Sequence, residues 1–96
     1  MKVGKAIQEI RLKRCLSQKD LAQRVGVTSI YLCNVEKEKK QCSPELLERI
    51  GEELKVPVIV FHIKSFEVAD LKANQRVKLL SWKNKTDKII EDLWGV

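Results

Sequence analysis

The feature that most constrains the fold is a helix-start signal that occurs three times between residues 17 and 43. Ser17, Thr28 and Ser43 each precede apolar residues at helical spacing, and Ser and Thr are preferred N-caps because the side-chain oxygen accepts a backbone N–H. Gly26 stands where a left-handed residue would end the first helix, and Pro44 suits the first turn of the last. The pattern predicts short helices at 18–25, 29–37 and 44–54.

An amphipathic helix precedes this trio and an ambiguous segment follows it. Val3, Ile7 and Ile10 recur at helical spacing, which predicts a helix from Val3 to about Arg14. Residues 57–63 are rich in β-branched side chains and fit either a short helix or a short strand, and we favour the helix because a proline suits its N1 position. Two short helices joined by a tight turn containing glycine are typical of a helix-turn-helix.

Positive charge is concentrated in the same part of the chain. The 96 residues include 19 Lys and Arg against 13 Asp and Glu, a formal net charge of +6. Residues 1–40 hold ten basic and four acidic residues, whereas residues 41–96 hold nine of each. A basic segment that surrounds a helix-turn-helix is expected where the protein meets a polyanion such as nucleic acid.

Several classes of protein fit the composition poorly. The longest apolar run, Val56 to Phe61, is far shorter than the roughly 20 residues that cross a bilayer, so we expect a soluble cytoplasmic protein without membrane contact. The three cysteines, Cys15, Cys33 and Cys42, form no CxxC pair, and His62 is the only histidine. We therefore expect reduced thiols packed as small apolar groups, no metal, no cofactor and no enzymatic activity.

Residues 16–36, LSQKDLAQRVGVTSIYLCNVE, resemble the helix-turn-helix regulators of the phage repressor and Cro type, also called the Xre type. The resemblance extends over about Val3 to Phe61. It implies an all-α protein with a compact five-helix DNA-binding domain, which we place at 1–66, in a bacterial or phage-encoded regulator. Residues 67–96 lie outside the family core, and we expect them to form a helical C-terminal extension. The matching positions are Gly4, Ile7, Arg11, Leu16, Ser17, Gln18, Leu21, Ala22, Gly26, Val27, Tyr31 and Glu36.

The resemblance also implies a partly buried ion pair between Arg11 and Glu36. The spacing agrees, because Glu36 follows Leu32 by four residues on the inward face of its helix, where a lone carboxylate would be costly. One position departs from the family, since Glu38 stands where members usually have glycine. We therefore expect either a longer third helix or an unusual path over 38–42.

In this family the third helix lies in the DNA major groove with its N-terminal residues at the base edges. Ile30 suits a thymine methyl and Asn34 suits adenine, although Ile30 also fits a scattered apolar residue on the surface. The expected base contacts are Thr28, Ser29, Ile30 and Asn34. The expected phosphate contacts are Gln18, Lys19, Lys37, Lys39 and Lys40, of which the lysines after the helix also fit a solvated charge run. Lys13 and Arg14 are weaker candidates.

The C-terminal extension contains apolar residues at alternating spacings of three and four, which predicts a helix that is continuous or broken near Asn84. Its candidate dimer or partner surface consists of Leu79, Trp82, Ile89, Leu93 and Trp94. Packing of these side chains inside the same chain fits the pattern equally well.

The function expected from these features is sequence-specific binding of double-stranded DNA by a transcription regulator. We expect a repressor that binds a pseudo-palindromic operator as a homodimer, with half-sites about 34 Å apart. One alternative is an antitoxin whose tail binds a protein partner while its helix-turn-helix autoregulates the operon. Another is an RNA-binding or coactivator-type use of the same fold.

Overall fold

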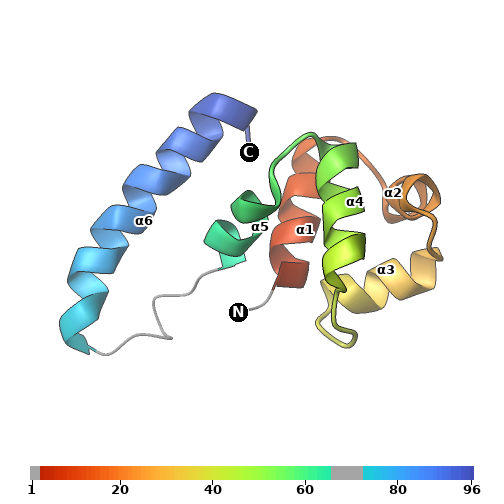
Figure 1. The fold of residues 1–96 in the computed structure, drawn as a ribbon, viewed down its shortest axis with the longest axis horizontal. Helices are drawn as coiled ribbons and strands as arrows, with labels where there is room; N and C mark the ends of the chain where they lie inside the picture. Colours follow the sequence, from red (N-terminus) through yellow and green to blue (C-terminus); the bar gives the residue numbers. More distant parts are fainter. Residues whose placement is uncertain (1–2, 66–72) are drawn as a thin grey trace.

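The computed structural model describes residues 3–65 and 73–96, and for 73–80 it describes the backbone alone. This part of the chain is helical throughout, with short connections (Figure 1). The segment at 57–63 lies in a helix, so the strand alternative is wrong. The elements are α1 (Val3–Lys13), α2 (Gln18–Val25), α3 (Ser29–Glu36), α4 (Pro44–Leu54), α5 (Val58–Ser65) and α6 (Ala73–Trp94).

The three predicted N-caps each accept a backbone hydrogen bond. The hydroxyl oxygens of Ser17, Thr28 and Ser43 accept the N–H groups three residues further on, at N···O distances of 3.0, 3.0 and 3.2 Å. Each bond satisfies one of the N–H groups that a helix start leaves without a partner. Gly26 ends α2 in the left-handed conformation, with φ at 79°. Local sequence therefore determines where these helices begin and end.

The core lies between α1 and the helices that surround it. Ile7 and Ile10 of α1, Leu32 of α3, Ile50 of α4 and Phe61 of α5 are all completely buried. Helix α1 packs against α3, α4 and α5, and α2 packs against α3 and α4. Burying each of these large side chains contributes about 1.5–3 kcal/mol, so this apolar cluster fixes the relative orientation of α2 and α3.

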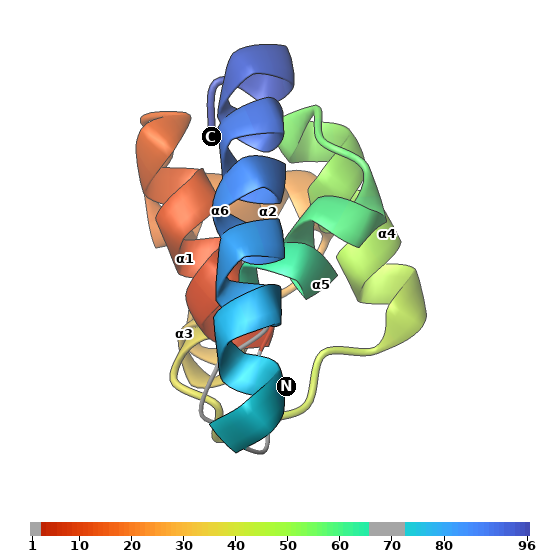
Figure 2. The same ribbon diagram turned by 90° about the vertical axis from the view of Figure 1, so that its left-hand side faces the viewer.

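Helix α6 is continuous through Asn84 and packs against α5, on the side of the molecule opposite α2 and α3 (Figures 1 and 2). It contributes Ile90 and Val96 to the core, with 2% and 1% of their surface exposed. Arg14 donates to the Leu54 carbonyl at 2.9 Å and to the Trp94 carbonyl at 2.7 Å. One basic side chain thus joins the C-terminal ends of α4 and α6.

The expected division of the chain falls at 66/67, which lies in the segment 66–72 outside the described residues. None of the described helices combines the length and the apolar character that a membrane span requires.

Candidate nucleic-acid interface

The N-terminal end of α3 projects from the domain, whereas the other side of the same helix is buried. Thr28 and Ser29 are exposed, and Ile30 is 74% exposed. Asn34 lies one turn further along and is half-buried. The opposite side of α3 packs into the core through Leu32, Val35 and Glu36. The structure therefore places three of the four predicted base-contacting residues at the N-terminal end of α3 and Asn34 one turn further along the same helix.

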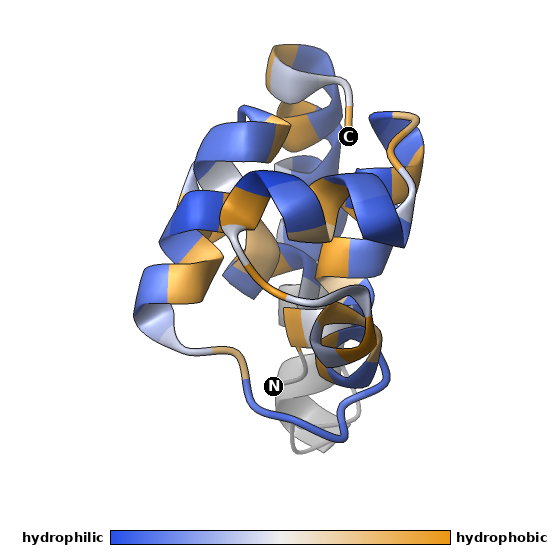
Figure 3. Cartoon of the chain, turned by 90° about the vertical axis from the view of Figure 1, so that its right-hand side faces the viewer, coloured by the Kyte–Doolittle hydropathy of each residue, from blue (hydrophilic) through white to orange (hydrophobic). Residues whose placement is uncertain are grey.

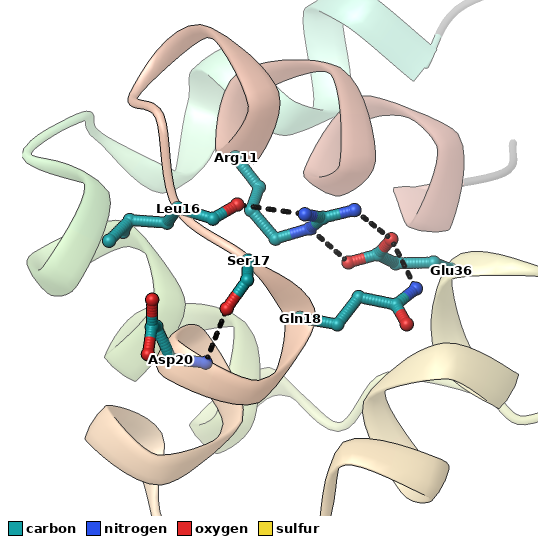
Figure 4. A network of polar contacts seen from close by, with 6 residues as sticks. All are labelled: Arg11, Leu16, Ser17, Gln18, Asp20 and Glu36. Atoms are coloured by element: carbon teal, nitrogen blue, oxygen red, sulfur yellow. Dashed lines mark hydrogen bonds and ion pairs between the residues drawn. The ribbon is translucent and has the colours of Figure 1, made fainter.

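A buried ion pair joins α3 to α1. Arg11 donates from Nε to Glu36 Oε2 at 2.8 Å and from Nη2 to Oε1 at 3.0 Å, and the two side chains are 7% and 1% exposed (Figure 4). A third guanidinium nitrogen donates to the Leu16 carbonyl at 2.8 Å. This two-point geometry holds both side chains in fixed orientations, so α3 is attached rigidly at its C-terminal end, opposite its exposed N-terminal end.

Gln18 belongs to this network rather than to the open surface. Its Nε2 donates to Glu36 Oε1 at 3.1 Å, and the side chain is half-buried (Figure 4). The sequence predicts Gln18 as a phosphate contact, but the structure directs its amide nitrogen to a carboxylate of the same chain. The amide nitrogen has a second hydrogen, so Gln18, the N–H groups at the start of α2 and the exposed Lys19 stay together as candidates for an anion at this end of α2.

The segment after α3 presents basic side chains on the surface. Lys37, Lys39 and Lys40 are exposed, and Figure 3 shows this hydrophilic loop below α4. Backbone bonds from the N–H groups of Lys39 and Lys40 to the Asn34 carbonyl, at 2.8 and 3.2 Å, fold the loop back against α3. The predicted phosphate-binding lysines therefore lie directly beyond the C-terminal end of the candidate reading helix.

Glu38 resolves the departure from the family pattern. Helix α3 ends at Glu36, and Glu38 has a φ of 64°, the left-handed conformation that glycine adopts without cost. Its Oε1 accepts the backbone N–H of Lys5 at 3.2 Å. The longer third helix is thus wrong: a glutamate takes the glycine conformation, and its carboxylate caps an N–H group in the first turn of α1.

Gly4 permits the close approach of α1 to this same region. A Cβ atom at Gly4 would collide with the Val35 carbonyl oxygen. The start of α1 can therefore lie against the end of α3 only without a side chain at this position, which gives a structural reason for the glycine in the sequence pattern.

The other two basic candidates serve the fold. Lys13 donates from Nζ to the Val96 carbonyl at 2.7 Å, and Arg14 binds the two carbonyls described above. Both side chains lie at the end of α6, away from α3. Their positive charges offset the partial negative charge at helix C-termini.

The predicted tail surface is divided between two faces of α6. Trp82, Ile89 and Leu93 are 49%, 56% and 66% exposed, whereas Trp94 is half-buried and packs against the core. The side chain of Leu79 lies outside the described residues. Sequence periodicity does not identify Ile90 and Val96, which make the actual contact, because the row through Ile90 also contains Lys83 and Asp87 and therefore lacks an apolar repeat.

A cavity of about 290 Å³ lies behind the lysine loop, lined mainly by apolar side chains that include Val35, Leu47 and Val58. Cys42 borders it, and burial raises the pKa of this thiol to about 11.

Cys15 is exposed at a φ of 60°, so the expectation that all three thiols are packed is wrong for this one. No group of three or more metal-binding side chains occurs among the described residues.

The fold is similar to those of two solved regulators. SinR, a master regulator for biofilm formation whose structure is in complex with DNA, is 28% identical, with a TM-score of 0.59 over 62% of this chain and 97% of that one. The clp gene regulator ClgR from Corynebacterium glutamicum is 22% identical, with a TM-score of 0.65 over 94% of this chain and 87% of that one, a likeness of fold alone. No curated protein matches the chain significantly.

The family described as Helix-turn-helix matches residues 7–61, which is more than half of the chain. The matched range runs from α1 to α5 and includes the Arg11–Glu36 pair and the exposed end of α3. The chain therefore belongs to the Xre-type helix-turn-helix family of DNA-binding transcription regulators.

Proposed function

We propose that this protein is a repressor that binds a pseudo-palindromic operator as a homodimer, with the N-terminal end of α3 in the major groove of each half-site. One observation carries the proposal: Ile30 is 74% exposed on a helix whose other side is fixed by a buried ion pair. A large apolar side chain held rigidly in water at a helix start suits contact with a thymine methyl group. The structure of SinR with DNA supports the same use of the fold.

Each predicted residue has a distinct task in this proposal. Ser29, Ile30 and Asn34 read base edges. Thr28 caps α3 and keeps its hydroxyl proton available for a base or a phosphate. Gln18, Lys19, Lys37, Lys39 and Lys40 bind phosphates, together with the N–H groups at the start of α2.

The division of labour is tested by comparing two kinds of variant. Ser29→Ala and Ile30→Ala remove base contacts, so each should lower affinity for the preferred duplex by about 5-fold to 100-fold while leaving random duplexes nearly unchanged. The double variant Lys39→Ala and Lys40→Ala removes four phosphate contacts from a dimer, so it should weaken all duplexes alike and reduce the slope of log affinity against log salt by about 4. Fluorescence anisotropy at several salt concentrations measures both.

Lys88→Ala is the matched control, because Lys88 is exposed on α6, far from α3. Equal loss on preferred and random DNA for Ile30→Ala would contradict the reading role. Duplex RNA should compete poorly, because its deep and narrow major groove does not admit a helix. Effective competition by RNA would favour the RNA-binding alternative instead.

The antitoxin alternative remains the second candidate function because Trp82, Ile89 and Leu93 are exposed together on α6. Truncation before Leu71 is a poor test of this alternative, since it also removes Ile90 and Val96 from the core. Point substitution of an exposed residue such as Leu93 separates partner binding from folding.

A further inference from the structure

Helix α6 has two lengthwise stripes, and only one of them faces its own domain. The first contains the buried Ile90 and the half-buried Trp94. The second, here called the outer stripe, consists of Trp82, Thr86, Ile89 and Leu93. Because successive residues are about 100° apart around a helix, the outer stripe lies about 100° around α6 from the first. It therefore faces sideways along the molecule and not directly away from the domain.

The outer stripe has the composition and spacing of a helix–helix contact. Its members are separated by four, three and four residues, the repeat with which two helices pack side chains into each other's gaps. The Thr86 hydroxyl donates to the Trp82 carbonyl at 2.8 Å, so this group is satisfied within the helix and its methyl group can enter an apolar contact. Three large apolar side chains in one exposed row are unusual on a solvated helix.

We propose that the outer stripe is covered by the outer stripe of a second copy of this chain, with the two α6 helices antiparallel. The inference deepens the proposed function, because an operator with two half-sites requires a dimer. In the alignment that sets Trp82 beside Leu93 of the second copy, Thr86 meets Ile89. The two-fold axis then passes between the helices close to Lys88.

The charged residues beside the outer stripe favour the antiparallel direction of the two α6 helices. Lys85 and Asp92 are both exposed and flank the outer stripe on its solvent side. In the antiparallel alignment Lys85 of each copy faces Asp92 of the other. Two ion pairs therefore form along the solvent side of the contact. In a parallel alignment the flank with Lys85 and Asp92 lies on opposite sides of the contact in the two copies, so neither pair forms.

The geometry of the domains selects the same direction. In an antiparallel pair the two-fold axis is perpendicular to the plane of the two helices. The α1–α5 domains of both copies therefore lie on the same side of the pair. Since α3 lies across the domain from α6 (Figure 1), the two α3 helices then point toward one duplex. In a parallel pair the axis runs along the helices and the domains lie on opposite sides, which prevents both α3 helices from reaching the same DNA.

Sedimentation equilibrium of the full chain without DNA tests the proposal. The samples are the wild type, Lys85→Asp, Asp92→Lys, their equimolar mixture and the control Glu91→Lys, with circular dichroism to verify folding. Glu91 is exposed on the side of α6 opposite the outer stripe. Reversing two ion pairs should raise the dimer Kd of each single variant by about tenfold. The mixture recreates both pairs, so its Kd should return to within about threefold of wild type, and Glu91→Lys should stay within the same range.

A wild type that stays monomeric up to a concentration of about 100 μM would overturn the proposal. A mixture that dimerises no better than the single variants would also overturn it. DNA binding separates this failure from failure of the proposed function. A monomer that still prefers one half-site sequence would overturn the α6 pairing alone. A dimer that prefers no duplex sequence would support the pairing and overturn the repressor function.

Discussion

The α1–α5 domain and α6 are stabilised by different kinds of contact. In the domain, completely buried side chains such as Ile7 and Phe61 surround a buried two-point ion pair. Helix α6 contributes Ile90 and Val96, and the side chains of Lys13 and Arg14 bind carbonyl groups at its end. The domain thus leaves mainly its α3 end and the lysine loop for a partner, whereas α6 leaves a whole apolar stripe. One helix can thus belong to a fold and still leave an apolar stripe exposed.

The largest effect is expected in the domain. Glu36→Ala leaves the Arg11 guanidinium buried without its carboxylate, and the free energy of unfolding should fall by about 3–5 kcal/mol. Urea unfolding measures this loss. Glu48→Ala, at an exposed position of α4, should change the free energy by no more than about 0.5 kcal/mol. A loss for Glu36→Ala as small as this control would show that the ion pair does not anchor α3.

A smaller and more local effect is expected in α6. Ile90→Ala opens a cavity at the edge of the core and should lower the free energy of unfolding by about 2–3 kcal/mol. Hydrogen exchange should accelerate in α6 while α1–α4 keep their protection. The neighbouring Glu91→Ala, at an exposed position on neither stripe, is the matched control, and equal effects at 90 and 91 would contradict the assignment of Ile90 to the core.

The smallest of the three effects is expected for Arg14, which joins α6 to the α1–α5 domain. Arg14→Met removes the donors to the Leu54 and Trp94 carbonyls and should cost about 1–2 kcal/mol. Hydrogen exchange at the C-terminal end of α6 reports this loss, and Arg49→Met, at an exposed position, serves as control. Duplex affinity should stay within about twofold of wild type, because the Arg14 charge serves the fold. A loss of affinity as large as that of the Lys39 and Lys40 double variant would place Arg14 at the DNA instead.

The two regions also differ in how much their sequence reveals. The caps Ser17, Thr28 and Ser43 act on N–H groups three residues away, so the starts of α2, α3 and α4 follow from local sequence. The partner of Glu36 is 25 residues distant. The resemblance to a known family implied that pairing, and periodicity indicated only that Glu36 faces inward.

The features that the sequence does not predict depend on contacts between residues that are distant in the sequence. Gln18 lies at a helix start and looks available for a phosphate, yet Glu36 lies within hydrogen-bond distance of its amide. The inward stripe of α6 contains Lys83 and Asp87, which form an ion pair along the helix at 4.0 Å. An apolar-periodicity argument therefore selects the outer stripe as the seam, although Ile90 and Val96 make the contact.

The central claim is that α3 reads DNA sequence through its exposed N-terminal end. Selection of bound duplexes from random DNA, with the wild type and with Ile30→Ala, tests this claim most directly. The wild type should enrich a pseudo-palindrome with half-sites about one helical turn apart, and Ile30→Ala should relax the preference at one thymine position in both half-sites. Enrichment of the same sequences by both proteins, or no enrichment by either, would contradict the claim.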